Sequence, residues 1–147
     1  MAQINPYLHF TGNAEEAFLF YKSVFGGEFT KVVKYKDLSQ SEEYPIAEEH
    51  LEQIMHIILP IGNGNVLMAS DAIRQNEHQK FTFGDNFHIA ISTESRDEAD
   101  YIFSGLALNA NVEMPIADSP WGAYFGMLKD QFGIQWTVEF DSINNQK

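Results

Sequence analysis

Residues 14–27, Ala-Glu-Glu-Ala-Phe-Leu-Phe-Tyr-Lys-Ser-Val-Phe-Gly-Gly, decide the fold of the first half of the chain. Apolar side chains recur there at i, i+3, i+4 and i+7, which is the spacing of one face of an α-helix. Asn13, with Glu16 three residues later, resembles a capping box at the start of this helix, and the two glycines end it. The stretch therefore predicts a helix over 14–25.

Strand-like segments surround this helix, one before it and three after it: 4–10, 28–36, 54–61 and 65–71. Gly62-Asn63-Gly64 predicts a tight hairpin between the last two. The polar, acidic segment 37–52 is expected to form a loop or a short helix. The first half therefore has the order strand, helix and three strands.

The same order returns after residues 73–85, a polar stretch that we interpret as a linker. Ser95 with Glu98 matches a Ser-x-x-Glu capping box, and an apolar stripe predicts a second helix over 96–107. The strands expected around it are 86–93, 112–117, 123–128 and 134–140. One βαβββ module cannot bury both faces of its sheet. We therefore predict an α+β fold in which two βαβββ modules, about 1–72 and 86–141, form one domain over 1–147 with a ligand cleft between them.

The composition excludes several classes of function. The chain has 147 residues, no cysteine and a formal net charge of -12. This charge opposes binding to nucleic acid or to an anionic membrane, and the missing cysteines exclude thiolate chemistry. Residues 1–5 contain no signal-peptide pattern, and no apolar stretch is long enough to span a bilayer. A cytoplasmic location is the expectation that fits best.

Motifs spread over nearly the whole chain resemble those of a known family. They are Pro6-Tyr7-Leu8-x-Phe10, Gly12-Asn13-x-x-Glu16-Ala17, Phe20-Tyr21-x-x-Val24-Phe25-Gly26-Gly27, Leu67-Met68-Ala69-Ser70-Asp71, Trp121-Gly122-x-Tyr124-x-Gly126 and Asp130-x-Phe132-Gly133-x-x-Trp136. In these motifs the chain resembles the PhnB-like branch of the vicinal-oxygen-chelate superfamily. That superfamily includes glyoxalase I, extradiol dioxygenases, fosfomycin thiol transferases and bleomycin-resistance proteins.

The resemblance implies four metal-ligand positions, on the first, fourth, fifth and eighth strands. His88, within Phe87-His88-Ile89-Ala90, matches the ligand of the fifth strand, but the other positions fall on Pro6, on or beside Met68, and on Thr137. One imidazole does not hold a catalytic metal, which normally has about three protein ligands. We therefore predict no cofactor and no tightly bound divalent metal at these positions, and metal binding through shifted ligands stays an open alternative. Glu139, on the same strand face as Thr137, stays open as a shifted ligand.

Strand alternation predicts which residues face the cleft. On the fifth strand the polar set with His88 lies opposite the apolar set with Ile89, and the eighth strand has a matching polar set. The fully apolar set of the fifth strand, Phe87, Ile89 and Ile91, suits burial beneath a helix. We expect His88 to be the main polar contact of a bound small molecule, with a structural role in the strand as the open alternative. The predicted ligand-binding residues are His88, Met68, Ser70, Gln135, Thr137, Glu139, Trp121 and Tyr124, of which Trp121 and Tyr124 could equally pack in the core.

Other polar candidates are interpreted as structural. His9 and His56 are expected to be hydrogen-bonded strand histidines, and His9 is expected to point away from the cleft. Asp71 is expected to be a turn or cap residue, and Trp136 a core residue. None of these four is predicted to contact a ligand.

Two classes of function stay open at this stage. One is a binding module whose cleft holds an apolar or cationic compound. The other is an enzyme, either a metal-dependent lyase, isomerase or dioxygenase or one that uses His88 as a general base. Homologues of this domain are often labelled as a demethylubiquinone methyltransferase, but no strand followed by a glycine-rich nucleotide loop is present, and no Gly-x-Ser-x-Gly supports a hydrolase. The substrate is unassigned, and a homodimer is expected because Phe- and Tyr-rich strands leave apolar surface to cover.

Overall fold

The computed structural model describes residues 2–38, 45–73 and 81–142. The chain divides into two compact units, Met1–Thr82 and Phe83–Lys147. The boundary falls within 73–85, the segment interpreted as a linker, of which residues 74–80 lie outside the described part. Each unit is described by itself.

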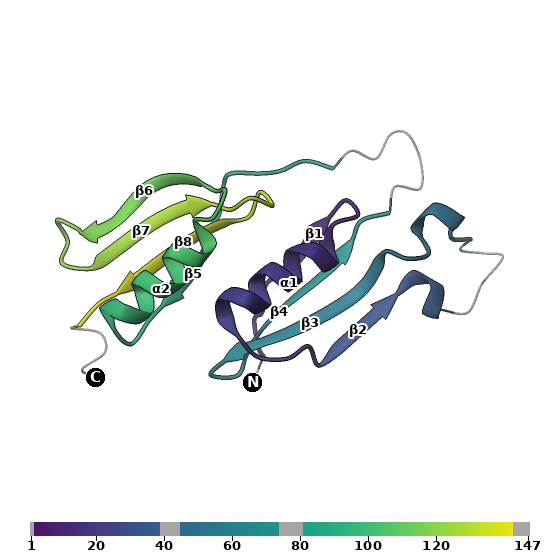
Figure 1. The fold of residues 1–147 in the computed structure, drawn as a ribbon, viewed down its shortest axis with the longest axis horizontal. Helices are drawn as coiled ribbons and strands as arrows, with labels where there is room; N and C mark the ends of the chain where they lie inside the picture. Colours follow the sequence, from purple (N-terminus) through teal and green to yellow (C-terminus); the bar gives the residue numbers. More distant parts are fainter. Residues whose placement is uncertain (1, 39–44, 74–80, 143–147) are drawn as a thin grey trace. The chain divides into compact units, whose positions relative to one another are not determined.

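The first unit is a four-stranded sheet with one long helix (Figure 1). Its elements are β1 (Tyr7–Phe10), α1 (Ala14–Phe25), β2 (Lys31–Lys34), the short 3-10 helices η1 (Tyr35–Asp37) and η2 (Glu48–His50), β3 (Ile54–Gly62) and β4 (Asn65–Asp71). The strand order is β1-β4-β3-β2. β1 runs parallel to β4, and the other neighbours are antiparallel.

Helix α1 covers the apolar face of this sheet. Its buried residues follow the predicted stripe, and they pack over β3 and β4, where Ile57 and Leu67 are fully buried. The helix ends at Gly26, whose positive φ of 79° suits glycine and whose N–H donates to the Lys22 carbonyl at 2.8 Å. The stripe and its stop are therefore confirmed.

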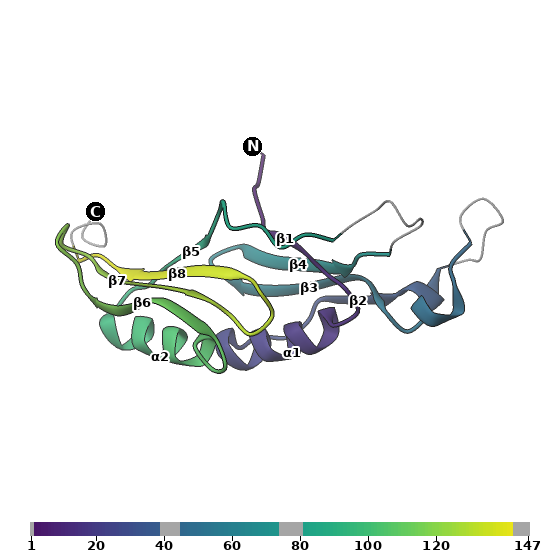
Figure 2. The ribbon, with the colours of Figure 1, turned by 90° about the horizontal axis from the view of Figure 1, so that it is seen from above.

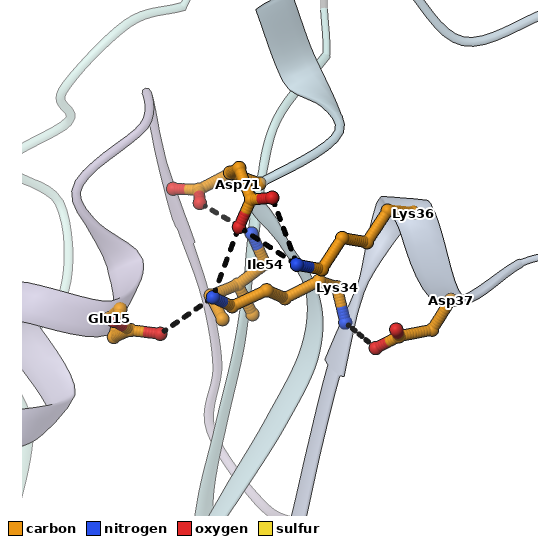
Figure 3. Close-up of polar contacts among 7 residues, drawn as sticks. Glu15, Lys34, Lys36, Asp37, Ile54 and Asp71 are labelled. Carbon is orange, nitrogen blue, oxygen red and sulfur yellow. Dashed lines mark hydrogen bonds and ion pairs between the residues drawn. The ribbon is translucent and has the colours of Figure 1, made fainter. Parts of the chain in front are cut away.

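The start of α1 differs from the prediction. Asn13 makes no side-chain capping hydrogen bond. The buried carboxylate of Asp71 takes that place, because its Oδ1 accepts from the N–H groups of Gly12 (2.9 Å) and Ala14 (3.0 Å). Its Oδ2 accepts from the N–H of Ile54 at 2.9 Å (Figure 3). The prediction of a capping box at Asn13 was wrong, and the prediction of Asp71 as a cap residue is confirmed.

The second unit repeats the architecture (Figure 1). Its elements are β5 (Ile89–Ser92), α2 (Arg96–Leu106), β6 (Asn111–Asp118), β7 (Tyr124–Lys129) and β8 (Gln135–Phe140). The strand order is β5-β8-β7-β6, again with one parallel pair, β5 with β8. Neither α1 nor α2, the long helices of the described part, has the length and apolar character needed to cross a membrane.

Helix α2 starts and packs by local rules that the sequence shows. The Ser95 hydroxyl accepts from the Glu98 N–H at 3.0 Å, as predicted, while the Glu98 carboxylate accepts from Glu94 N–H instead of Ser95 N–H. Against the sheet, Gly126 allows a close approach, because a Cβ there would lie 2.7 Å from a ring carbon of Phe103. Trp136 is fully buried and donates from Nε1 to Asp130 Oδ2 at 2.8 Å, so its predicted core role is confirmed.

The predicted fold of two βαβββ modules is confirmed, and the main differences lie at strand ends. β2 covers only four residues of the predicted 28–36, because the chain turns into η1, where Asp37 accepts from the Lys34 N–H at 2.9 Å (Figure 3). β5 begins at Ile89 and not at residue 86. The predicted loop or short helix at 37–52 contains η2, and its residues 39–44 lie outside the described part.

Candidate functional site

Each sheet has its helix on one face, and among the described residues no helix of the same unit covers the other face (Figure 2). We call this uncovered side the open face of the sheet. In the second unit, the register of β5 and β8 shows which residues lie on it. Ala90 and Ser92 of β5 pair with Thr137 and Glu139 of β8, and both β5 residues are exposed. The alternate residue Ile91 pairs with buried Val138 on the helix side. The predicted split of these strands into a helix face and an open face is therefore present in this unit.

The polar residues of β8 contact β5 and the segment before it. Glu139 Oε1 accepts from the Ser92 hydroxyl at 3.4 Å. The buried Gln135 donates from Nε2 to the Phe87 carbonyl at 2.6 Å, which fixes the backbone next to His88. Phe87 itself is 62% exposed, so the prediction that it lies buried under a helix was wrong. It precedes β5, where strand alternation does not control the side chain.

His88 contacts a carboxylate that the sequence did not single out. Its Nε2 lies 3.4 Å from Oε1 of Glu113, a residue of β6. β5 and β6 are opposite edges of the sheet, so the two side chains reach towards each other across its width. The distance suits an ion pair, but the geometry makes no hydrogen bond, and Nε2 is fully buried without a hydrogen-bond partner within the described residues.

A register shift in β6 explains why the sequence did not identify Glu113 as a site residue. Val112 pairs with Leu128 and Met114 with Met127, so Glu113 is an extra residue at a β-bulge. Strand alternation carries no information about the direction of such a side chain. The side chains of His88 and Glu113 are 20% and 33% exposed, so the pair is largely withdrawn from solvent.

The two aromatic candidates go to different places. Trp121 is 61% exposed and packs edge-to-face on Phe125, with ring centroids 5.4 Å apart. Phe125 pairs with Glu139, which puts it on the open face. Tyr124 lies on the helix side: its hydroxyl donates to Asp100, and Arg96 lies 4.4 Å from its ring centroid. The hydrogen bond to Asp100 raises the pKa of Tyr124. The structure does not bring Tyr124 to the open face.

Met68 and Ser70 lie on the open face of the first unit. Ser70 pairs with His9, and its hydroxyl lies 3.3 Å from His9 Nδ1. His56 is also hydrogen-bonded, because its Nδ1 lies 3.2 Å from the Tyr7 hydroxyl. Both strand histidines are therefore hydrogen-bonded, as predicted. The predicted direction of His9 was wrong, because β1 starts at Tyr7 and its parity puts His9 on the same face as Ser70.

The predicted site residues thus form two groups. Met68 and Ser70 belong to the first unit, whereas His88, Gln135, Thr137, Glu139 and Trp121 belong to the second. One cavity shared by both groups stays a prediction.

The donor set does not fit the superfamily's metal. No three His, Cys, Asp or Glu residues come together as possible metal ligands in the part of the chain that the structure describes. His88 is accompanied by one carboxylate, that of Glu113, and the other family positions hold Pro6, Met68 and Thr137. Two donors are fewer than the roughly three protein ligands of a catalytic metal.

A family model described as 3-demethylubiquinone-9 3-methyltransferase matches residues 2–139. The chain belongs to this PhnB-like family. Protein PA1353 from Pseudomonas aeruginosa has 32% sequence identity to it and a TM-score of 0.82, over 96% of this chain and 98% of the other. A Bacillus cereus structure described as a putative 3-demethylubiquinone-9 3-methyltransferase, PhnB protein, has 26% identity and a TM-score of 0.74, over 95% and 99% of the two chains.

Protein YjdN from Escherichia coli (strain K12) is similar to this PhnB-like chain, with 25% identity over 138 residues and 92% of each chain covered. A more distant structure, described as a glyoxalase/bleomycin resistance protein/dioxygenase family enzyme, has 14% identity and a TM-score of 0.56. At this identity the likeness shows the fold alone. The PhnB-like chain therefore has the glyoxalase/bleomycin resistance fold.

Proposed function

We propose that this PhnB-like protein binds a small molecule on the open faces of its sheets, with His88 as the main polar contact. The observation that carries the proposal is the buried Nε2 of His88, which has no hydrogen-bond partner within the described residues. A buried polar atom without a partner costs about 1–3 kcal/mol, so native structures rarely keep one without a role. A ligand atom that displaced the Glu113 carboxylate and bonded to His88 Nε2 would remove this cost.

The neighbours of His88 favour an apolar or cationic ligand. Glu113 and Glu139 bring carboxylates to the second unit, and Trp121 packs against Phe125 at the end of its open face. Aromatic rings and carboxylates together attract organic cations. In the proposed cleft, Met68 and Ser70 would contribute from the first unit.

A second candidate function is proton transfer. A carboxylate next to an imidazole is the arrangement that orients a histidine general base. Glu113 lies in that position relative to His88 Nε2. A metal-dependent lyase, isomerase or dioxygenase has less support, because the described donors do not form a three-ligand site.

The test is a panel of small organic cations and neutral aromatic compounds, screened by their effect on the melting temperature. We expect compounds that stabilise the wild-type protein to lose at least tenfold in affinity in His88→Ala, while the melting temperature of the free variant stays close to that of wild type. His50→Ala, which removes a histidine of η2 in the first unit, is the matched control. Equal affinities in His88→Ala and wild type would reject the proposed site.

The homodimer is also part of the proposal. Large apolar side chains are exposed on the second unit, among them Tyr101 (67%), Phe87 (62%) and Trp121 (61%). A second copy would cover such surface. Sedimentation at micromolar concentration should give a dimer, and a monomer would contradict it. A cytoplasmic location stays a proposal that cell fractionation would test.

A further inference from the structure

The open face of the first unit gathers three aromatic hydrogen-bonding groups. The ring centroid of Tyr7 lies 5.2 Å from that of His9 and 5.5 Å from that of His56, which it stacks on at 19°. The Tyr7 hydroxyl and His56 Nδ1 are 3.2 Å apart, and Ser70 Oγ and His9 Nδ1 are 3.3 Å apart. β1, β3 and β4 therefore bring two imidazoles and two hydroxyls together.

The strands of the first unit place no acidic side chain on this open face. The chain has 21 Asp and Glu residues against 9 Lys and Arg, yet β1 to β4 contain a single acidic residue, Asp71. Asp71 is 1% exposed and its carboxylate is bonded to backbone N–H groups at the start of α1 and β3. The open face of the first unit is thus free of strand carboxylates in an acidic protein.

One lysine of β2 adds a positive charge to this face. Lys31 pairs with Ile58, two residues from His56 on β3, and makes no ion pair within the described residues. Lys34 and Lys36 differ, because Lys34 reaches Glu15 of α1 (Figure 3) and both lysines pair with Glu52. Burial and the charge of Lys31 both lower the pKa of His56. Lys31 lies on the same face as His56, because Val33, two residues from Lys31 on β2, pairs with His56.

We propose that Tyr7, His9, His56 and Lys31, all residues of the first unit, form a subsite for an oxyanion. Lys31 would supply a charge and the histidines would supply N–H donors, and hydrogen bonds from charged donors to oxyanions are the strong ones. The subsite does not depend on the ligand proposed for His88.

Proton uptake would accompany anion binding. In the tautomer of neutral His56 that carries its proton on Nε2, the Tyr7 hydroxyl donates to Nδ1. Once His56 is protonated, Nδ1 donates to the Tyr7 oxygen, and the Tyr7 O–H becomes available to the anion. The titratable groups on this face are Tyr7 and His9 of β1, Lys31 of β2 and His56 of β3, and β4 contributes none. Tyr35 of η1 is the neighbouring group that interacts electrostatically with Tyr7. A fixed dianion should therefore bind more tightly as the pH falls.

Sodium sulfate is the probe, because its charge is constant between pH 6 and pH 8. The full chain is titrated at constant ionic strength, and the histidine ring signals are followed by NMR. We expect saturable shifts of His9 and His56 and a dissociation constant at least threefold lower at pH 6 than at pH 8. Shifts no larger than those caused by sodium chloride of the same ionic strength would overturn the proposal.

Matched variants locate the effect. Lys31→Gln and Lys36→Gln change the net charge equally, but only Lys31→Gln should weaken sulfate binding, by threefold or more. Equal weakening in both would show a general charge effect and overturn the subsite. His88→Ala should retain sulfate binding, so a failure of the His88 proposal leaves this result unchanged. Loss of sulfate binding in His88→Ala would contradict a separate subsite.

Discussion

The two units share one order of elements, but each uses its buried aspartate differently. Asp71 accepts from the backbone N–H groups of Gly12, Ala14 and Ile54, so it joins the start of α1 to β3. Asp130 accepts from Phe132 and Ile134 N–H and from the indole of Trp136, so it stabilises the β7–β8 turn. In the second unit Ser95 caps the helix, and the aspartate is not needed there. The same architecture is therefore stabilised by different local contacts.

The open faces differ in the same way. β1 to β4 have no acidic residue apart from the buried Asp71, and Tyr7, His9 and His56 share their open face. In the second unit Glu113 approaches His88, and Glu139 accepts from Ser92. Glu113 and Glu139 thus bring carboxylates to the second unit, where Lys129 also lies on the open face, whereas the strands of the first unit bring none to theirs. This difference is the basis of the two proposed ligand sites.

The comparison of the aspartates predicts the largest change in stability. Asp71→Asn should lower the free energy of unfolding by about 3 kcal/mol, since it leaves a buried N–H unpaired and removes a charge at the N-terminus of α1. Asp130→Asn should cost about 2 kcal/mol, because it affects a turn and an indole but no helix start. Urea unfolding followed by far-UV circular dichroism measures both. Equal losses, or a larger loss in Asp130→Asn, would break the comparison.

Helix packing in the second unit predicts the next effect. In Gly126→Ala the new Cβ would lie 2.7 Å from Phe103 Cε2 and 3.0 Å from Ile116 Cα. Since α2 or β6 must then shift, we expect a loss of about 2 kcal/mol. Gly84→Ala is the control, because its Cβ would meet only Asn86 Oδ1 at 3.4 Å. A Gly126→Ala protein as stable as this control would show that α2 has room to move.

The two helix starts give a smaller and more selective contrast. Ser95→Ala removes an acceptor of the Glu98 N–H and should cost about 1 kcal/mol. Asn13→Ala removes no capping hydrogen bond, so its stability should stay close to that of wild type. The same urea series measures both. A cost at Asn13 as large as that at Ser95 would mean that the two starts are capped alike.

The pH dependence of the first unit predicts the smallest effect. The pKa of His56 is lowered by burial and by Lys31 from an ordinary value of 6.5. The unfolded chain then takes up this proton at higher pH than the folded chain, so stability falls as the pH drops below about 6.5 towards the folded pKa. In His56→Gln the melting temperature should decline less over this window. An unchanged decline would assign the pH dependence to other groups.

The sequence predicted the parts of the fold that depend on periodic patterns. The apolar stripe that ends at Gly26 located α1. The capping pair of Ser95 and Glu98 located the start of α2. Both ends of β4 were predicted correctly, because a glycine hairpin precedes the strand and Asp71 is its last residue. β5 was predicted three residues too long at its start, since the apolar side chain of Phe87 gave no sign that it would be exposed.

The candidate site was predictable only where strand alternation holds. Ala90 and Thr137 share a face as expected, because β5 and β8 pair without a bulge. Glu113 was missed because its side chain follows a register shift in β6. The direction of His9 was predicted wrongly, because the residue at which β1 starts determines which face His9 lies on. Tyr124 lies on the helix side, where it contacts Asp100 and Arg96 of α2. Long-range partners of this kind leave no local pattern.

Elemental analysis of the protein, purified without added chelator, tests the central claim that the His88 site works through side chains and not through a metal. With Pro6, Met68 and Thr137 at three ligand positions, we expect far less than one equivalent of any divalent transition metal per chain. About one zinc, nickel, manganese or iron per chain, lost in His88→Ala, would contradict the account and support a metal-dependent enzyme.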